Sequence, residues 1–243
     1  MKILLYSDVH GNLEALWAVL KDAEKRGFDA AFCLGDTVGY GADPEECVKI
    51  VSGLSRGSTV LGNHDAAIID PLERGYLNTA AQAGVRYSMA NLSPESVEYL
   101  KSLPLRIESD HGFVASHGSP NKPEEWIYIL DSMEVREALQ VMTHPLAFIG
   151  HTHYLAVHNG EGRMNAILPG KPIALRPGDK CLVNVGSVGQ PRDADSRAAY
   201  VLFDDAAQVV EGFRVEYDVD TAARKIVEAG LPAILADRIR HGY

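Results

Sequence analysis

Seven side chains that can bind metal ions lie in short glycine-containing turns within the first 153 residues. They are carboxylates, imidazoles and one amide, a set without thiolate that suits Mn²⁺, Fe or Zn²⁺. A single catalytic ion usually takes three or four protein ligands, so seven groups predict two ions that share a carboxylate, roughly 3.5–4 Å apart. The seven residues are Asp8, His10, Asp36, Asn63, His117, His151 and His153.

Each of these turns directly follows an apolar run that is typical of a buried strand. In an open α/β sheet, ligands bind where the carboxyl ends of the strands converge on one crevice. Five of the nine histidines fall in these turns, a concentration that packing or surface histidines would not show. We therefore expect a single site at one edge of the sheet. The expected strands are residues 2–6, 30–34, 58–61, 113–116 and 147–149.

Helical patterns separate these strands. After residue 153, glycine and proline turns divide the chain into short strand-like runs, which we interpret as hairpins and antiparallel strands rather than further crossover units. We predict one domain over residues 1–243, an α/β fold with two sheets and helices outside. The expected helices are residues 12–25, one capped by Asp43, a stretch around 76–90, helices opening at Ser93 and near Asp131, one after Asp218, and a closing stretch near 231–239.

Composition restricts the class of protein. The formal net charge is −10, and without a basic face a large nucleic-acid footprint is disfavoured. The apolar start, residues 1–6, is too short for a signal peptide or a membrane helix, so we expect a cytoplasmic protein that does not bind membranes. Cys33, Cys47 and Cys181 lie far apart in the sequence. We expect them to be small buried apolar residues, not a disulfide framework or a metal knot.

Taken in order, five motifs resemble the signature of calcineurin-like metallophosphoesterases. The similarity covers residues 5 to about 155, and the stretch 184–192 is similar to the small prokaryotic phosphodiesterase branch. The resemblance implies a two-sheet αββα sandwich in a single metallophosphoesterase domain, and a metal-dependent phosphoric ester hydrolase. The five motifs are Asp8-x-His10, Gly35-Asp36, Gly62-Asn63-His64-Asp65, His117 and Gly150-His151-Thr152-His153.

The resemblance also implies how the ligands divide between two divalent ions, with Mn²⁺ as the expected metal and Fe or Zn²⁺ as alternatives. Asp36 would bridge the two ions. Two cations lower the pKa of a bridging water, and the resulting hydroxide would attack phosphorus in line with the leaving oxygen. The same cations would neutralise charge on the phosphoryl oxygens. The first ion would be held by Asp8, His10 and His153, and the second by Asn63, His117 and His151.

Three further residues are expected to act on a small phosphate-ester substrate. The resemblance implies that His64 binds no metal, lies over the substrate phosphate and is oriented by Asp65. Protonation of the leaving group by His64 would contribute typically ~10²–10⁴ in rate. Arg192, in the turn 189–192, is the arginine that we favour for phosphate binding, because arginine pairs well with phosphate.

The expected activity is that of a phosphodiesterase, and two other interpretations stay open. A serine/threonine protein phosphatase of this superfamily normally carries Gly-Asp-x-Val-Asp-Arg-Gly, whereas residues 35–41 read Gly-Asp-Thr-Val-Gly-Tyr-Gly and lack the arginine. An inactive protein-interaction scaffold of this fold has lost the histidine of the Gly-Asn-His turn, whereas His64 is present here. The natural substrate, the preference for monoesters or diesters, the native metals and the oligomeric state are left open.

Overall fold

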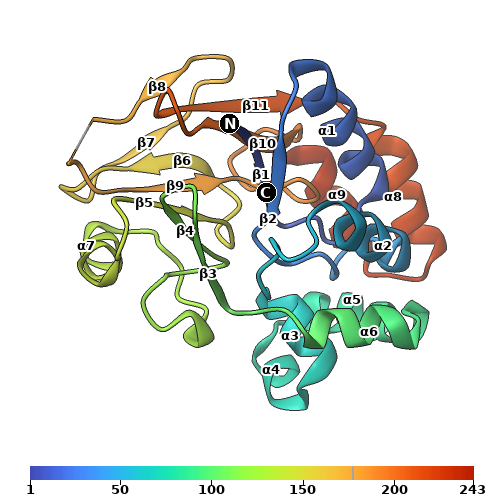
Figure 1. The fold of residues 1–243 in the computed structure, drawn as a ribbon. Helices are drawn as coiled ribbons and strands as arrows, with labels where there is room; N and C mark the ends of the chain where they lie inside the picture. Colours follow the sequence, from blue (N-terminus) through green and yellow to red (C-terminus); the bar gives the residue numbers. More distant parts are fainter. Residues whose placement is uncertain (177) are drawn as a thin grey trace.

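Two mixed sheets form the centre of the protein in a computed structural model that describes residues 1–176 and 178–243 (Figure 1). Within these residues the first sheet contains, in spatial order, β2 (Ala30–Cys33), β1 (Lys2–Tyr6), β10 (Ala198–Asp204), β11 (Val209–Val215) and β8 (Ile173–Ala174). The second contains β3 (Arg106–Ser109), β4 (Phe113–Ser116), β5 (Leu146–Ile149), β9 (Cys181–Val185), β6 (Leu155–His158) and β7 (Met164–Ala166). The predicted two-sheet α/β architecture is confirmed.

The main core lies between the two sheets and follows from the alternation of side chains along each strand. In β1, Ile3 and Leu5 join a buried cluster that also takes residues from β4, β5, β9 and β10, whereas Leu4 packs in a second cluster with helix residues. Phe113 and Phe148 meet edge to face in the first cluster, with ring centroids 5.0 Å apart. Both faces of β1 are therefore buried, as expected for a central strand that reads as continuously apolar.

Helices cover the outer faces of the sheets and one end of the sandwich (Figure 1). The amphipathic helix α1 buries Leu16 and Val19 against the first sheet, and α7 buries Val135 and Leu139 against the second. Four helices, α3 to α6, gather at one end (Figure 1). The helices are α1 (Leu13–Arg26), α2 (Pro44–Leu54), α3 (Asn63–Ile69), α4 (Pro71–Tyr76), α5 (Thr79–Asn91), α6 (Pro94–Lys101), α7 (Ser132–Val141), α8 (Val219–Glu228) and α9 (Ala233–His241), with a short 3₁₀ helix η1 (Pro123–Glu125).

Helix capping explains several of these boundaries. The side chains of Ser93, Asp131 and Asp218 accept hydrogen bonds from the first turns of α6, α7 and α8, which confirms the predicted starts. Asp43 is the N-cap residue of α2, as predicted, but its carboxylate accepts from Lys225 Nζ at 3.0 Å and makes no capping bond to the helix. An ammonium group brought in by α8 offers the carboxylate a charged partner in place of a backbone N–H.

Two predictions about strands are wrong. Residues 58–61 form no regular strand, since only Thr59 makes an isolated parallel bridge, to Cys33. The chain turns at Gly62 straight into α3, so Asn63 opens a helix. In the second half, β9 pairs in parallel with β5, so the expectation of antiparallel strands alone does not hold. Among the helices of residues 1–176 and 178–243, none is long and apolar enough to cross a membrane.

Candidate metal centre

The seven predicted ligands come together at one end of the sandwich. Six lie just after strands β1, β2, β4 and β5, and Asn63 lies at the start of α3. The six are at most 3% exposed, and Asn63 is half-buried. Five of them adopt left-handed backbone conformations, which cost free energy in residues other than glycine and concentrate at functional sites. These five are Asp8, His10, Asp36, His151 and His153, with φ between 51° and 66°.

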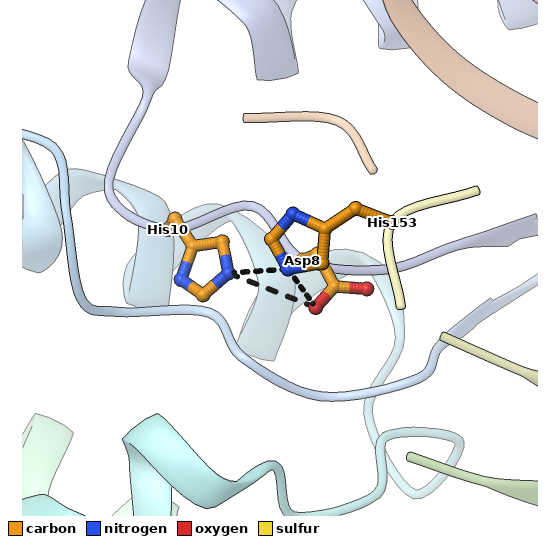
Figure 2. A group of neighbouring side chains, drawn as sticks. All are labelled: Asp8, His10 and His153. Atoms are coloured by element: carbon orange, nitrogen blue, oxygen red, sulfur yellow. Dashed lines mark hydrogen bonds and ion pairs between the residues drawn. The ribbon is translucent and has the colours of Figure 1, made fainter. Parts of the chain in front are cut away.

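One group contains Asp8, His10 and His153 (Figure 2). Asp8 and His10 are the first predicted ligands along the chain, and His153 is the last. Oδ1 of Asp8 lies 3.1 Å from Nε2 of His153 and 3.6 Å from Nε2 of His10. The two Nε2 atoms are 3.2 Å apart. Three lone-pair donors therefore face one another at distances suited to a shared cation.

A second group lies beside the first and contains His117, His151 and Asp36. Nε2 of His117 is 3.0 Å from Nδ1 of His151 and 3.2 Å from Oδ1 of Asn63. Asp36 lies between the groups, since its Oδ2 is 3.3 Å from Nε2 of His117 and 3.7 Å from Nε2 of His10. A third combination, of His10 and Asp36 with His64, also has its ligand atoms within 4.8 Å of one another.

Backbone carbonyls fix the orientation of all four histidines. Nδ1 of His10 donates to the carbonyl of Val38 at 3.1 Å, and Nδ1 of His117 to that of Leu34 at 2.7 Å. Nδ1 of His153 likewise donates to the carbonyl of Gln190. Nε2 of His151 donates to the carbonyl of Trp126 at 2.8 Å. Each ring thus directs its other nitrogen, with a free lone pair, into the centre, as metal-binding histidines do.

The two carboxylates are held in the same way. Oδ2 of Asp8 accepts from the N–H of His151 at 3.1 Å, and Oδ1 of Asp36 from the N–H of His64 at 2.8 Å. Each carboxylate keeps its second oxygen for the centre. Within the described residues Oδ1 of Asp8 is buried and makes no hydrogen bond of good geometry, although His153 is near. A buried anionic oxygen without a partner is costly, so the donor set fits bound cations.

The carboxylates and histidines of the centre strongly affect one another's pKa values. Burial would raise the pKa values of Asp8 and Asp36, but the positive charge and hydrogen bonds of nearby histidines hold both well below the usual range. Burial would lower the pKa of His117, but Asp36 outweighs it and raises the value to about 9. Burial and the neighbouring His117 lower the pKa of His151 to about 3. Protons and metal cations therefore compete for the same nitrogen and oxygen atoms of this centre.

His64 lies beside this centre, and the expected role of Asp65 in orienting it is wrong. The carboxylate of Asp65 accepts from the backbone N–H groups of Val38 and Gly62, at 3.2 and 3.3 Å. It is the N3 acid of α3 and satisfies an N–H at the helix start. Among the described residues, Nδ1 of His64 has no hydrogen-bond partner. It packs against Gly39, where an added Cβ would lie 2.7 Å from this nitrogen.

Arg192 reaches the same centre from the loop before β10. Its guanidinium donates to the hydroxyl of Tyr40 at 3.2 Å and to Oε1 of Gln190 at 3.1 Å. The ring of Tyr40 lies 4.5 Å from that of His10 and 4.6 Å from that of His64. Burial lowers the pKa of His153, and the charge of Arg192 lowers it further, to about 4. The structure thus places the predicted phosphate-binding arginine next to the predicted ligands.

Comparison with known proteins agrees with this arrangement. Residues 1–207 match the calcineurin-like phosphoesterase superfamily domain. The chain belongs to this superfamily. It is 40% identical over 240 residues to an uncharacterized protein of Methanocaldococcus jannaschii, covering 98% of this chain and 96% of that one.

Solved structures extend the comparison to the fold. A metallophosphoesterase from Sphaerobacter thermophilus is 37% identical, with a TM-score of 0.91, and the match covers 100% of this chain and 99% of that one. A hypothetical protein from Pyrococcus horikoshii OT3 is 20% identical, with a TM-score of 0.77, and covers 100% and 98%. The second likeness concerns the fold alone. Both cover nearly the full length of the chain, including the region after residue 153.

Sequence reasoning missed several groups that shape this calcineurin-like centre. Four of them are backbone carbonyls, which every residue possesses, so no residue type could have indicated them. Trp126 is one of the missed residues, and it supplies the carbonyl that orients His151. The only signal for Trp126 is an aromatic residue, one of two tryptophans in the chain, directly after the acidic pair 124–125.

Proposed function

We propose that this chain is a phosphodiesterase that depends on two divalent metal ions. The observation that carries the proposal is the orientation of four buried histidines, each tied to a carbonyl through one nitrogen and open at the other. Their open nitrogens form two groups on either side of Asp36. In this proposal Asp8, His10 and His153 would hold the first ion, Asn63, His117 and His151 would hold the second, and Asp36 would contribute to both.

The residues of the centre have separate tasks in the proposed reaction. When two divalent cations are bound, the chemistry supplied is Lewis acidity, which acidifies a water nucleophile and neutralises phosphoryl oxygens. His64 lies at the edge of the ligand cluster and donates a hydrogen bond to the phosphate or to the leaving oxygen. Asp65 fixes the start of α3 and so positions the backbone of His64. Mn²⁺ is the proposed metal, with Fe and Zn²⁺ as alternatives.

Arg192 is the proposed phosphate-binding residue. In the protein phosphatase motif the arginine occupies the position of Tyr40, and here the hydroxyl of Tyr40 instead accepts a hydrogen bond from Arg192. Arg192, which lies 152 residues further along the chain, thus supplies a guanidinium group to this turn. Because a planar guanidinium pairs bidentately with phosphate oxygens, Arg192 can replace the missing arginine. The surrounding residues 39–41 differ from that motif, which favours a different substrate class.

We also propose that the whole chain works as one domain in the cytoplasm. The three cysteines are buried free thiols, which suits a reducing compartment. A small phosphate ester is the proposed substrate.

Phosphodiesterase activity can be tested by removing metal with a chelator and restoring Mn²⁺. We expect faster hydrolysis of bis-p-nitrophenyl phosphate than of p-nitrophenyl phosphate. His64→Ala should reduce diester hydrolysis by roughly 10²–10⁴-fold. The matched control is His241→Ala, which removes an exposed histidine near the C-terminal end. Elemental analysis of the protein as isolated identifies the native metal.

Two results would contradict the proposal. Hydrolysis of neither ester, with no effect of His64→Ala on any measured rate, would indicate an inactive scaffold. Hydrolysis of the monoester alone would remove the diester preference, and a phosphoserine peptide would then test the protein phosphatase alternative.

A further inference from the structure

A cavity of about 500 Å³ opens directly beside the proposed second metal position. Asn63 and His151 line it, so a group bound in it would adjoin the reacting phosphorus of the proposed reaction. Its walls come from α4 and from the loop that contains η1, and they include the aromatic residues Tyr76, Trp126 and Tyr128. The volume lies within the range of roughly 300–1,000 Å³ that is usual for small-molecule sites.

Trp126 links this cavity to the metal centre. Its backbone is left-handed, with φ of 52°. Its carbonyl accepts from Nε2 of His151, and its indole N–H donates to Oε2 of Glu73 in α4, each at 2.8 Å. One residue therefore orients a proposed metal ligand through its backbone and fixes a carboxylate of the cavity wall through its side chain. The strained backbone is typical of a position held for function.

The cavity is acidic as well as aromatic. Glu73, Glu124 and Glu125 line it, and no lysine or arginine is found among its lining residues in the described part of the chain. Lys122 pairs with Glu125 at 2.8 Å but is exposed. Two of the carboxylates thus have no cationic partner among the described residues. A phosphate or carboxylate group inside the cavity would be repelled by these glutamates.

Charge therefore differs between the two ends of the cleft. Arg192 and the proposed cations attract an anion at the inner end, and the glutamates repel one at the outer end. Tyr128 lies between them, since it lines the cavity and its ring stacks on that of His151 in the centre, with centroids 3.8 Å apart. A substrate matched to this cleft carries its phosphate inside and an uncharged or cationic organic group outside.

We infer that this cavity, the acidic aromatic pocket, binds one organic arm of the ester and selects an uncharged, nucleoside-sized ring system with N–H or O–H donors. Aromatic side chains provide stacking surfaces for such rings. Carboxylates accept hydrogen bonds from exocyclic amines and from ribose hydroxyls. A quaternary ammonium arm would suit the rings and the charge, but it has no N–H for Glu73 and is small for a cavity of about 500 Å³.

This inference rests on the proposed function for the position of the phosphate, but pocket binding can be measured without catalysis. Trp17, on α1, is 56% exposed, and the chain has two tryptophans. Trp17→Phe therefore leaves Trp126 as the sole indole reporter. Adenosine should quench its fluorescence saturably, whereas choline chloride should not. Tyr76→Ala should weaken adenosine binding by roughly 5–150-fold, the usual loss for one stacking partner.

We expect the Tyr76 substitution to leave the fold intact, because this side chain is 84% exposed. Tyr243→Ala, which removes a tyrosine 51% exposed at the other end of the chain, is the matched control and should leave adenosine binding unchanged. In kinetic assays, p-nitrophenyl thymidine 5′-phosphate should give a kcat/KM at least about tenfold above that of p-nitrophenylphosphorylcholine. Glu73→Gln should reduce this ratio, whereas Glu228→Gln, at an exposed position of α8, should not.

The outcomes separate this inference from the proposed function. Adenosine binding without hydrolysis of any ester would overturn the phosphodiesterase proposal and support the pocket. Hydrolysis of bis-p-nitrophenyl phosphate without quenching by adenosine would overturn the pocket alone. Quenching by choline, or preference for the choline ester, would assign the pocket to a quaternary ammonium group and overturn the nucleoside-sized ring.

Discussion

Each histidine and carboxylate of the centre is positioned by the side-chain atom that does not face the proposed ions. One nitrogen of each histidine and one oxygen of each carboxylate bind the backbone. The opposite atoms face the proposed ions. This arrangement removes rotational freedom before metal binding, so little conformational entropy is lost when a cation enters. It also explains why ligands far apart in the sequence lie at distances of 3.0–3.7 Å.

Asp36→Asn tests the shared ligand. Asparagine keeps the oxygen that accepts from the N–H of His64 but removes the negative charge between the two groups. We expect the fold to be retained, less than the full metal content by elemental analysis, and diester hydrolysis reduced by more than about 100-fold, beyond the usual loss for an outer-shell change. Asp110→Asn, at an exposed aspartate, should match the parent protein. Full metal content in Asp36→Asn would contradict its bridging role.

At the residue scale, the sequence was informative wherever a residue type carries the function. The sequence predicted seven residues that the structure brings together, because six carboxylate and imidazole side chains follow strands and Asn63 follows Gly62. The role of Asp65 could not be predicted, since its neighbours Val38 and Gly62 bind it through backbone N–H groups. A motif shows which residues are near one another in the chain but not which atoms their side chains bind.

Glu45 couples α2 to α6 and provides a pH-dependent test. Its carboxylate lies at the start of α2 and accepts from the N–H of Ser93, the cap of α6, at 3.0 Å. Burial would raise its pKa, but hydrogen bonds from Ser93 and Ser96 outweigh this and lower the value to about 2. A carboxylate with a lowered pKa stabilises the fold above its unfolded value of 4.5 and loses this effect as the pH falls toward 2.

Glu45→Gln should accordingly reduce the free energy of unfolding at pH 7 by about 1–3 kcal/mol. The difference from the parent should shrink between pH 4.5 and 2, where the parent carboxylate becomes protonated. Urea unfolding followed by circular dichroism at pH 7, 4 and 3 measures this difference in the free energy of unfolding. A difference that is constant over this range would show that the charge of Glu45 has no part in stability.

Gly84 connects α5 to the turn that carries Tyr40. A Cβ at this position would lie 2.1 Å from the carbonyl oxygen of Gly39, although Ala normally favours a helix over Gly by about 1 kcal/mol. We expect Gly84→Ala to destabilise the protein and lower diester hydrolysis, because the turn beside His64 must move. Gly53→Ala, in α2 with open space around it, should be neutral or stabilising. Thermal unfolding of both variants shows whether each substitution lowers or raises the Tm.

At the element scale, strand and helix starts with a local cause were predictable. Ser93 and Asp131 cap helices through their own side chains, and each lies directly before its helix in the sequence. The pairing of β9 with β5 has no such local signal, since it joins residues about 35 positions apart. Short strands take their direction from the sheet that they join, and this information lies outside the segment itself.

Metal binding should stabilise the whole molecule, because the proposed ligands come from both sheets and from α3. Ligand at about 100 times its dissociation constant adds about 2.7 kcal/mol. For a chain of 243 residues this corresponds to a rise in Tm of roughly 5–10 °C. Differential scanning fluorimetry with Mn²⁺ against a chelator measures the shift. Asp36→Asn should show a smaller rise, and an equal rise in both proteins would place the stabilising ion elsewhere.

The central position of β1 has a consequence for synthesis of the chain. β1 pairs with β10, so residues 2–5 find their antiparallel partners only at residues 201–204. The carbonyl of Asp8 is likewise bound by the N–H of Gly189. At roughly 5–20 residues per second, about 10–40 s separate the emergence of these segments from the ribosome. During that interval one edge of the apolar strand β1 has no partner, although its other edge can pair with β2. We therefore expect metal binding at the proposed centre to be one of the last steps in maturation, and a ribosome-stalled chain that ends before β10 to bind chaperones rather than metal.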